Sequence, residues 1–130
     1  MWEMSELDLE RERAAKNQSL FREVNERIQD LAPTGHPVGF ICECLNTECD
    51  QPVALTVEEY EQIRSGSTKF LVLPGHEVER VEEVVGLTDR YLVVSKLGIG
   101  GRFAAALDPR QRNAEFSTAV NRATNRALDE

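Results

Sequence analysis

Residues 5–32 carry apolar side chains at the spacing of an α-helix that buries one face. These positions recur at intervals of one, three or four residues, and they are Leu20, Phe21, Val24, Ile28 and Leu31. Ser5 is a favourable cap at the start, and Pro33 with Gly35 marks the end. We predict a long amphipathic helix that packs on its own domain through this apolar stripe. The alternative is that it protrudes and docks on a partner or dimerises.

Shorter apolar segments follow, each bounded by residues that favour turns. The predicted strands are 38–45, 52–55, 70–73, 81–87 and 91–97. After the second strand, Thr56 and Glu59 form a capping box that opens a helix of about ten residues. The pattern therefore predicts an α+β fold, with a long amino-terminal helix, a small antiparallel sheet and one short helix.

The character of the chain changes at Gly98–Gly101, a glycine-rich stretch that we expect to be a flexible joint. Residues 114–128 have a weak helical pattern with a small apolar face, formed by Phe116, Val120, Ala123 and Ala127. The expected organisation is a helix over 1–33, a metal-binding α+β domain over 34–97, and a flexible or weakly helical tail over 98–130. A tail that docks on a partner is the alternative.

All three cysteines lie within eight positions, at Cys42, Cys44 and Cys49. In a strand, side chains two residues apart point to the same face, so Cys42 and Cys44 should project together while Glu43 faces the other way. The polar segment 45–48 is suited to a chain reversal that brings Cys49 back towards the first two sulfur atoms. The spacing therefore indicates a metal-binding knuckle of the form Cys-x-Cys-x4-Cys.

A histidine is needed to complete a set of four ligands, and the chain offers His36 and His76. We favour His76, because Pro74-Gly75 places it on a defined turn directly after a buried strand. His36 lies in a loop six residues before Cys42 and stays open as the alternative. Three cysteines and one histidine form a recognised set for structural zinc. The predicted cofactor is one zinc ion (Zn²⁺) per chain, held by Cys42, Cys44, Cys49 and His76.

The cysteines could also serve a purpose that needs no metal. Free cysteine is a small apolar side chain that fills cores by itself. Disulfide bonding is the second possibility, but an odd number of cysteines leaves one thiol over. The acidic residues Glu43, Glu48 and Asp50 among the cysteines are unusual for core filling, and this favours the metal.

The formal net charge of the chain is −8. This charge disfavours direct nucleic-acid binding, which depends on neutralising phosphates. No stretch approaches the roughly 18 consecutive apolar residues of a membrane-spanning helix. The first residues lack the basic and apolar regions of a signal peptide, so we expect a cytoplasmic protein with reduced thiols and no membrane association.

Several motifs together resemble an uncharacterised family of small bacterial proteins. They are the segment 17–27, Cys42-Glu43-Cys44 with Cys49, Leu55-Thr56 before Glu58-Glu59-Tyr60, Pro74-Gly75-His76-Glu77, and Asp89-Arg90-Tyr91. The resemblance covers about residues 10–97. It implies no activity, only that His76 belongs to the same motif set as the cysteines.

Three classes of function remain open at this point. The first is a small zinc-binding, non-catalytic module for regulation or protein interaction, with a protein partner that the sequence does not identify. The second is a thiol-based redox or metal sensor, since zinc-bound thiolates can be oxidised. The third is a zinc enzyme, which would need an open coordination position and a general base such as Glu43 or Glu77. Four ligands leave no open position, so an enzyme is the least favoured.

Overall fold

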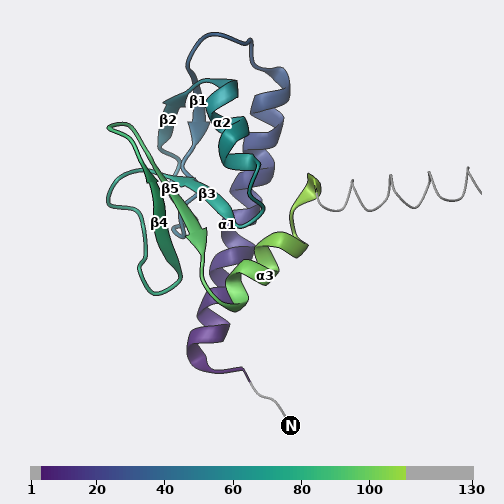
Figure 1. Ribbon diagram of the computed structural model, residues 1–130, viewed down its shortest axis with the longest axis vertical. Helices are drawn as coiled ribbons and strands as arrows, with labels where there is room; N and C mark the ends of the chain where they lie inside the picture. The colour runs from purple at the N-terminus through teal and green to yellow at the C-terminus, as the bar shows by residue number, and fades with distance from the viewer. Residues whose placement is uncertain (1–3, 111–130) are drawn as a thin grey trace, which may run out of the picture.

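The computed structural model describes residues 4–110. The elements in chain order are α1 (Glu6–Leu31), β1 (Val38–Ile41), β2 (Pro52–Leu55), α2 (Val57–Arg64), β3 (Lys69–Val72), β4 (Glu82–Leu87), β5 (Leu92–Lys96) and α3 (Ile99–Ala106). The long helix α1 runs along one side of the molecule, with β1, β2 and α2 beside its carboxyl-terminal half and α3 crossing its amino-terminal half (Figure 1). The predicted α+β class is confirmed.

The strands form two antiparallel sheets. β1 pairs with β2, and β5 lies between β3 and β4 in the second sheet. The two sheets meet just beyond the end of β1, where the Glu43 amide donates a hydrogen bond to the Leu71 carbonyl of β3 at 2.6 Å. This junction places the segment that carries the cysteines against the three-stranded sheet.

Both predicted helix caps are present. The side chains of Ser5 and Thr56 accept hydrogen bonds from the third residue of their helices, Asp8 and Glu59, whose carboxylates bond back to the cap amides. Each reciprocal pair satisfies two backbone donors that would otherwise lack a partner at the helix start. The boundaries of α1 and α2 therefore follow from local sequence.

The face that α1 buries is mostly polar, and three of the five residues of the predicted apolar stripe are exposed. Leu20, Val24 and Leu31 are 63%, 44% and 86% exposed. The buried positions of α1 are Ala14, Ala15, Gln18, Ser19, Arg22 and Asn25. The expectation of packing through the stripe was therefore wrong for Leu20, Val24 and Leu31, whereas Ile28 is partly buried against the core. Buried polar side chains that bond backbone groups of other elements supply much of the attachment of α1.

Arg22 illustrates this mode of attachment. Its fully buried guanidinium donates to the Ser67 carbonyl at 2.7 Å and to the Ala104 carbonyl of α3 at 2.8 Å. It also lies over the ring of Phe70, 4.6 Å from the centroid. One side chain of α1 thus connects α1 to α3, to the loop before β3 and to the core.

The glycine-rich segment expected to be a flexible joint instead begins helix α3. Gly98 has φ +56° and caps the helix, and Gly100 lies where an added Cβ would be 3.1 Å from the Arg11 backbone oxygen of α1. The glycines therefore permit a turn and a close helix–helix contact, with Ala104 fully buried. The predicted helix at 114–128 lies outside the described residues.

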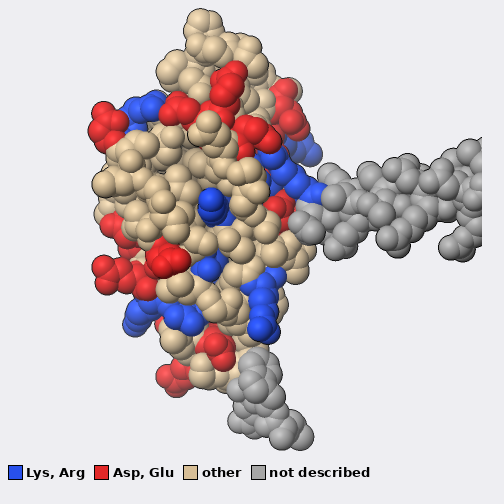
Figure 2. Space-filling view, in the orientation of Figure 1, with Lys and Arg blue, Asp and Glu red and all other residues tan. Residues whose placement is uncertain are grey.

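Charged side chains of both signs are interspersed on the face of the molecule shown in Figure 2. Buried ion pairs are also present in the described part of the chain. Glu82 pairs with Lys96 at 2.7 Å, and Arg64 pairs with Asp108 at 2.6 Å. Within residues 4–110, no helix has the length and apolar character needed to cross a membrane.

Candidate metal centre

Cys42 and Cys44 follow directly after β1, in a segment held on both sides. The Cys42 amide donates to the Gln51 carbonyl at 3.1 Å, and the Glu43 amide donates to β3. Both cysteines are buried, and Glu43 between them is buried on the opposite side, as the alternation along an extended segment predicts.

The segment between β1 and β2 reverses direction at Asn46. The Asn46 carbonyl accepts a hydrogen bond from the Cys49 amide at 3.0 Å, and its side-chain oxygen accepts one from the Glu48 amide at 3.0 Å. Asparagine is favoured at turns for this reason. The reversal returns Cys49 towards Cys42 and Cys44, as predicted.

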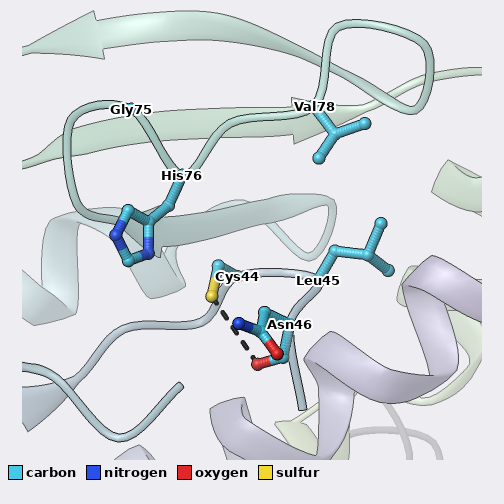
Figure 3. A pocket seen from close by; sticks show the side chains of 6 residues that line it. All are labelled: Cys44, Leu45, Asn46, Gly75, His76 and Val78. Carbon is cyan, nitrogen blue, oxygen red and sulfur yellow. Dashed lines mark hydrogen bonds between the residues drawn. The ribbon is translucent and has the colours of Figure 1, made fainter. Parts of the chain in front are cut away.

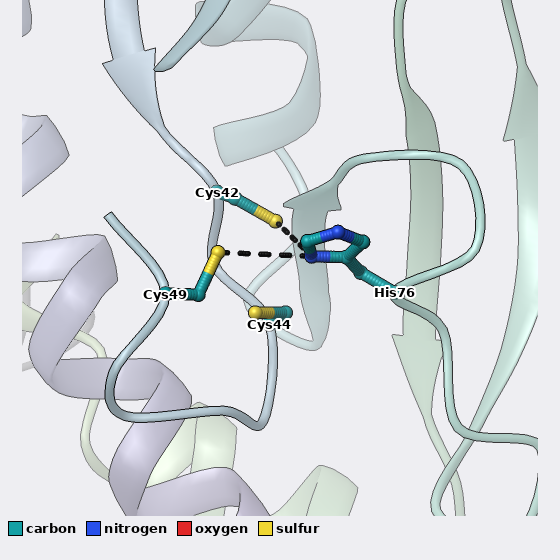
Figure 4. A group of neighbouring side chains, drawn as sticks. All are labelled: Cys42, Cys44, Cys49 and His76. Carbon is teal, nitrogen blue, oxygen red and sulfur yellow. Dashed lines mark hydrogen bonds between the residues drawn. The ribbon is translucent and has the colours of Figure 1, made fainter. Parts of the chain in front are cut away.

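His76 reaches the cysteines from the loop after β3. Its amide donates to the Leu73 carbonyl at 3.0 Å, closing a turn in which Gly75 has φ +90°. The imidazole Nδ1 lies 3.6 Å from the Cys42 sulfur and 3.7 Å from the Cys49 sulfur (Figure 4). The turn at Pro74-Gly75 therefore directs the imidazole at the sulfur atoms.

The four side chains can hold one metal ion. One ligand atom from each of Cys42, Cys44, Cys49 and His76 lies within 4.8 Å of all the others. Zn–S bonds of about 2.3 Å and a Zn–N bond of about 2.0 Å would separate tetrahedral ligands by about 3.5–3.8 Å. The two distances from Nδ1 fall in that range, so small shifts of the sulfur atoms would bring all four ligands onto one zinc ion.

His36, the alternative fourth ligand, is an exposed residue of the loop between α1 and β1. It is not among the residues that converge with the cysteines. Among the described residues, the geometry therefore selects His76.

The surroundings of two of the thiols raise their pKa values. Burial raises the pKa of Cys42 and Cys44 above the usual range, and for Cys42 the neighbouring thiols add to this effect. The Leu73 amide opposes it by donating to the Cys42 sulfur at 3.2 Å. Buried thiols of raised pKa stay protonated unless a cation compensates their charge, which a divalent metal does when it displaces the protons.

A hollow of about 470 Å³ lies beside the cluster on the side of Cys44 and His76. Leu45, Asn46, Gly75 and Val78 complete its lining (Figure 3). It provides a route by which a metal or a small reagent can approach the ligands, a feature that a metal site requires.

Glu43 has a role that the sequence analysis did not foresee. It is fully buried and accepts hydrogen bonds from Asn25, Tyr60 and the Leu71 amide. Burial raises the pKa of its carboxyl group, while these bonds oppose the shift. Because its carboxylate faces the interior, Glu43 is not placed to act as a general base at the cluster. In the local sequence, this role is indicated only by the position of Glu43 between two cysteines.

No protein-family model, curated protein or solved structure matches this chain. The resemblance to a bacterial family therefore stays a prediction. The structure does support its coarser content, a cluster of Cys42, Cys44, Cys49 and His76 consistent with a small metal-binding knuckle.

Proposed function

We propose that this protein is a small zinc-binding, non-catalytic module in which one zinc ion maintains the central fold. The observation that carries the proposal is the convergence of three sulfur atoms and one imidazole within 4.8 Å. Three thiolates and one imidazole match the closed tetrahedral set of structural zinc and leave no coordination position for a substrate. The three free thiols suit a reducing, cytoplasmic compartment.

The position of the cluster explains why zinc would matter to folding. Its ligands come from the segment after β1, the reversal before β2 and the loop after β3, so the ion would join the two sheets. Within residues 4–110, neither sheet has more than three strands. Structural zinc contributes on the order of 10–16 kcal/mol of apparent binding free energy, which is comparable to the whole stability of a small domain.

Chelation tests this function. The zinc-loaded protein is melted with and without a chelator in excess, and circular dichroism follows its secondary structure. We expect the melting temperature to fall sharply on chelation and to recover when zinc, but not magnesium, is restored. An unchanged melting curve after complete metal removal would overturn the proposal.

We also propose that this module has a regulatory role that involves a protein partner. Three exposed apolar residues of α1, which form an exposed strip on the helix, support this role. Leu20, Val24 and Leu31 present apolar side chains to solvent along one helix. Exposed apolar patches commonly mark interaction sites. A photo-reactive residue at position 24 should crosslink a partner in cells, and the same residue at Glu58, an exposed position of α2, should not. Equal crosslinking at both positions would reject the strip as the contact surface.

Thiol-based sensing is the second candidate, favoured by the hollow that Cys44 and His76 line. Peroxide would convert one thiolate to a sulfenic acid, and a second thiolate would displace hydroxide from it to form a disulfide. The two electrons that the thiolates lose in forming the disulfide reduce the peroxide. The disulfide no longer binds zinc, so the ion is released. Stoichiometric peroxide should then release zinc to a chromogenic chelator, whereas a purely structural site would retain its ion.

A further inference from the structure

Glu43 occupies a position that connects the candidate ligands to three other elements. Its neighbours in sequence, Cys42 and Cys44, point to the cluster, while its own side chain points into the interior. Because Glu43 lies between two candidate ligands, a shift of its backbone displaces the residues on both sides. Contacts that hold the backbone of Glu43 in place therefore help to hold both sulfur atoms in place.

Each carboxylate oxygen of Glu43 has protein partners. One oxygen accepts the Leu71 amide of β3 at 2.8 Å. The other oxygen accepts a hydrogen bond from the Tyr60 hydroxyl of α2 at 2.6 Å and one from the side-chain amide of Asn25 of α1 at 2.9 Å. These bonds to a buried carboxylate belong to the stronger class of hydrogen bonds.

The backbone around Glu43 is attached to α1 as well. Gln18 donates to the Glu43 carbonyl at 2.8 Å, and Asn25 exchanges hydrogen bonds in both directions with the backbone of Ile41, at 2.7 and 2.8 Å. Two of the buried polar side chains of α1, Gln18 and Asn25, are thus attached to the segment 41–43. Such directional bonds are lost by small displacements, unlike apolar contacts.

We propose that Glu43 is a positioning residue of the metal centre. It holds the two flanking cysteines in binding geometry, and it couples metal binding to the packing of α1 against the segment 41–43. This inference rests on the proposed function and adds to it a route between the metal and the helix. The coupling is reciprocal: if bound metal favours the packed position of α1 by a given factor, packing of α1 must raise the affinity for the metal by the same factor.

The test compares Glu43→Gln with Glu48→Gln. Both replace a carboxyl group of the knuckle with an amide, but Glu48 is exposed and its side chain lies outside the hydrogen-bond network of Glu43. Glutamine at position 43 keeps the shape and loses one of the two acceptor oxygens. We expect Glu43→Gln to raise the Kd for zinc, measured by chelator competition, by about tenfold, as is typical when residues that orient metal ligands are changed. Glu48→Gln should bind as the wild type does.

Cobalt substitution gives a spectrum that would not change if Glu43 only stabilised the fold. The visible absorption of tetrahedral Co²⁺ depends on ligand geometry, so Glu43→Gln at saturating cobalt should shift or weaken these bands. The milder variant Tyr60→Phe removes a single hydroxyl and should change affinity and spectrum in the same direction, which keeps the test valid if Glu43→Gln does not fold.

The outcomes separate the two proposals. A wild-type protein that binds no stoichiometric zinc overturns the proposed function, and this inference with it. A wild type that binds zinc, with Glu43→Gln and Tyr60→Phe unchanged in Kd and in cobalt spectrum, overturns the positioning role alone. A lower melting temperature without those changes would make Glu43 a core residue only.

Discussion

Replacing Asn25 by leucine should destabilise the protein, although it adds an apolar side chain to a buried helix face. Asn25 is fully buried on α1 and makes three hydrogen bonds, two with the backbone of Ile41 and one with the Glu43 carboxylate. Leucine has a similar size and makes none of them. The substitution therefore separates polar attachment from apolar packing as the source of stability.

The magnitude follows from the groups left without partners. The Ile41 amide and carbonyl, which are partly buried, and the buried Glu43 carboxylate each lose their Asn25 partner, at a cost of about 1–2 kcal/mol per group. Burial of the leucine side chain returns up to about 2 kcal/mol. We expect a net loss of about 2–4 kcal/mol, a large part of the free energy of unfolding of a domain this size.

Urea unfolding at saturating zinc, followed by circular dichroism, measures this loss. The control is Leu20→Asn, on the same helix but 63% exposed, which should cost less than about 1 kcal/mol. An Asn25→Leu protein as stable as the wild type, or a Leu20→Asn protein that loses more than Asn25→Leu, would refute the attachment of α1 through its polar face.

Three further experiments test other parts of the fold. Arg110 lowers the pKa of Glu61 from its usual 4.5 to about 2, so the pair contributes stability above pH 4.5 that is lost as pH falls towards 2. Because the Glu61 side chain is 55% exposed, Glu61→Gln, which leaves the contacts of Arg110 with Glu26 and Gln29 in place, should cost under about 1 kcal/mol at pH 6, and urea titrations should show the difference shrinking below pH 4.5. Lys96→Met would leave the buried Glu82 carboxylate without its cation and cost about 3–5 kcal/mol, and adding Glu82→Gln should recover part of this loss in the same assay. Gly100→Ala places a Cβ 3.1 Å from a backbone oxygen of α1 and should cost about 1–2 kcal/mol, seen as a lower melting temperature.

The clustering of Cys42, Cys44, Cys49 and His76 could be predicted from the sequence because its geometry is mostly local. Two-residue periodicity places Cys42 and Cys44 on one side, and the turn at Asn46 returns Cys49 within a few positions. His76 follows 27 residues after Cys49, and the Pro-Gly turn before it gave the reason to prefer it. The contact itself depends on how β3 lies against the cysteine segment, which no local pattern specifies.

The packing of α1 could not be predicted in the same way. Helical periodicity assumes that the apolar face is the buried one. Here Gln18, Arg22 and Asn25 find their partners 25, 82 and 16 residues away, at Glu43, Ala104 and Ile41. A polar residue gives no sign in the sequence that a distant backbone group will satisfy it.

Helix α3 was missed for a related reason. Gly98, Gly100 and Gly101 within four positions are typical of a flexible connection. In the structure Gly98 adopts a left-handed backbone conformation, and Gly100 allows a close contact with α1. The sequence shows that glycine is present, but the need for it comes from the neighbouring helix.

The most direct test of the account is the zinc content of three purified proteins, measured by mass spectrometry of the metal. The wild type and His36→Ala should each carry one zinc ion per chain, and His76→Ala should lose most of its zinc under mild chelator competition. His36 is exposed and lies apart from the cluster, so it is a matched control for the loss of an imidazole. A wild type without zinc, or equal retention by both variants, would contradict the central claim that Cys42, Cys44, Cys49 and His76 hold one ion.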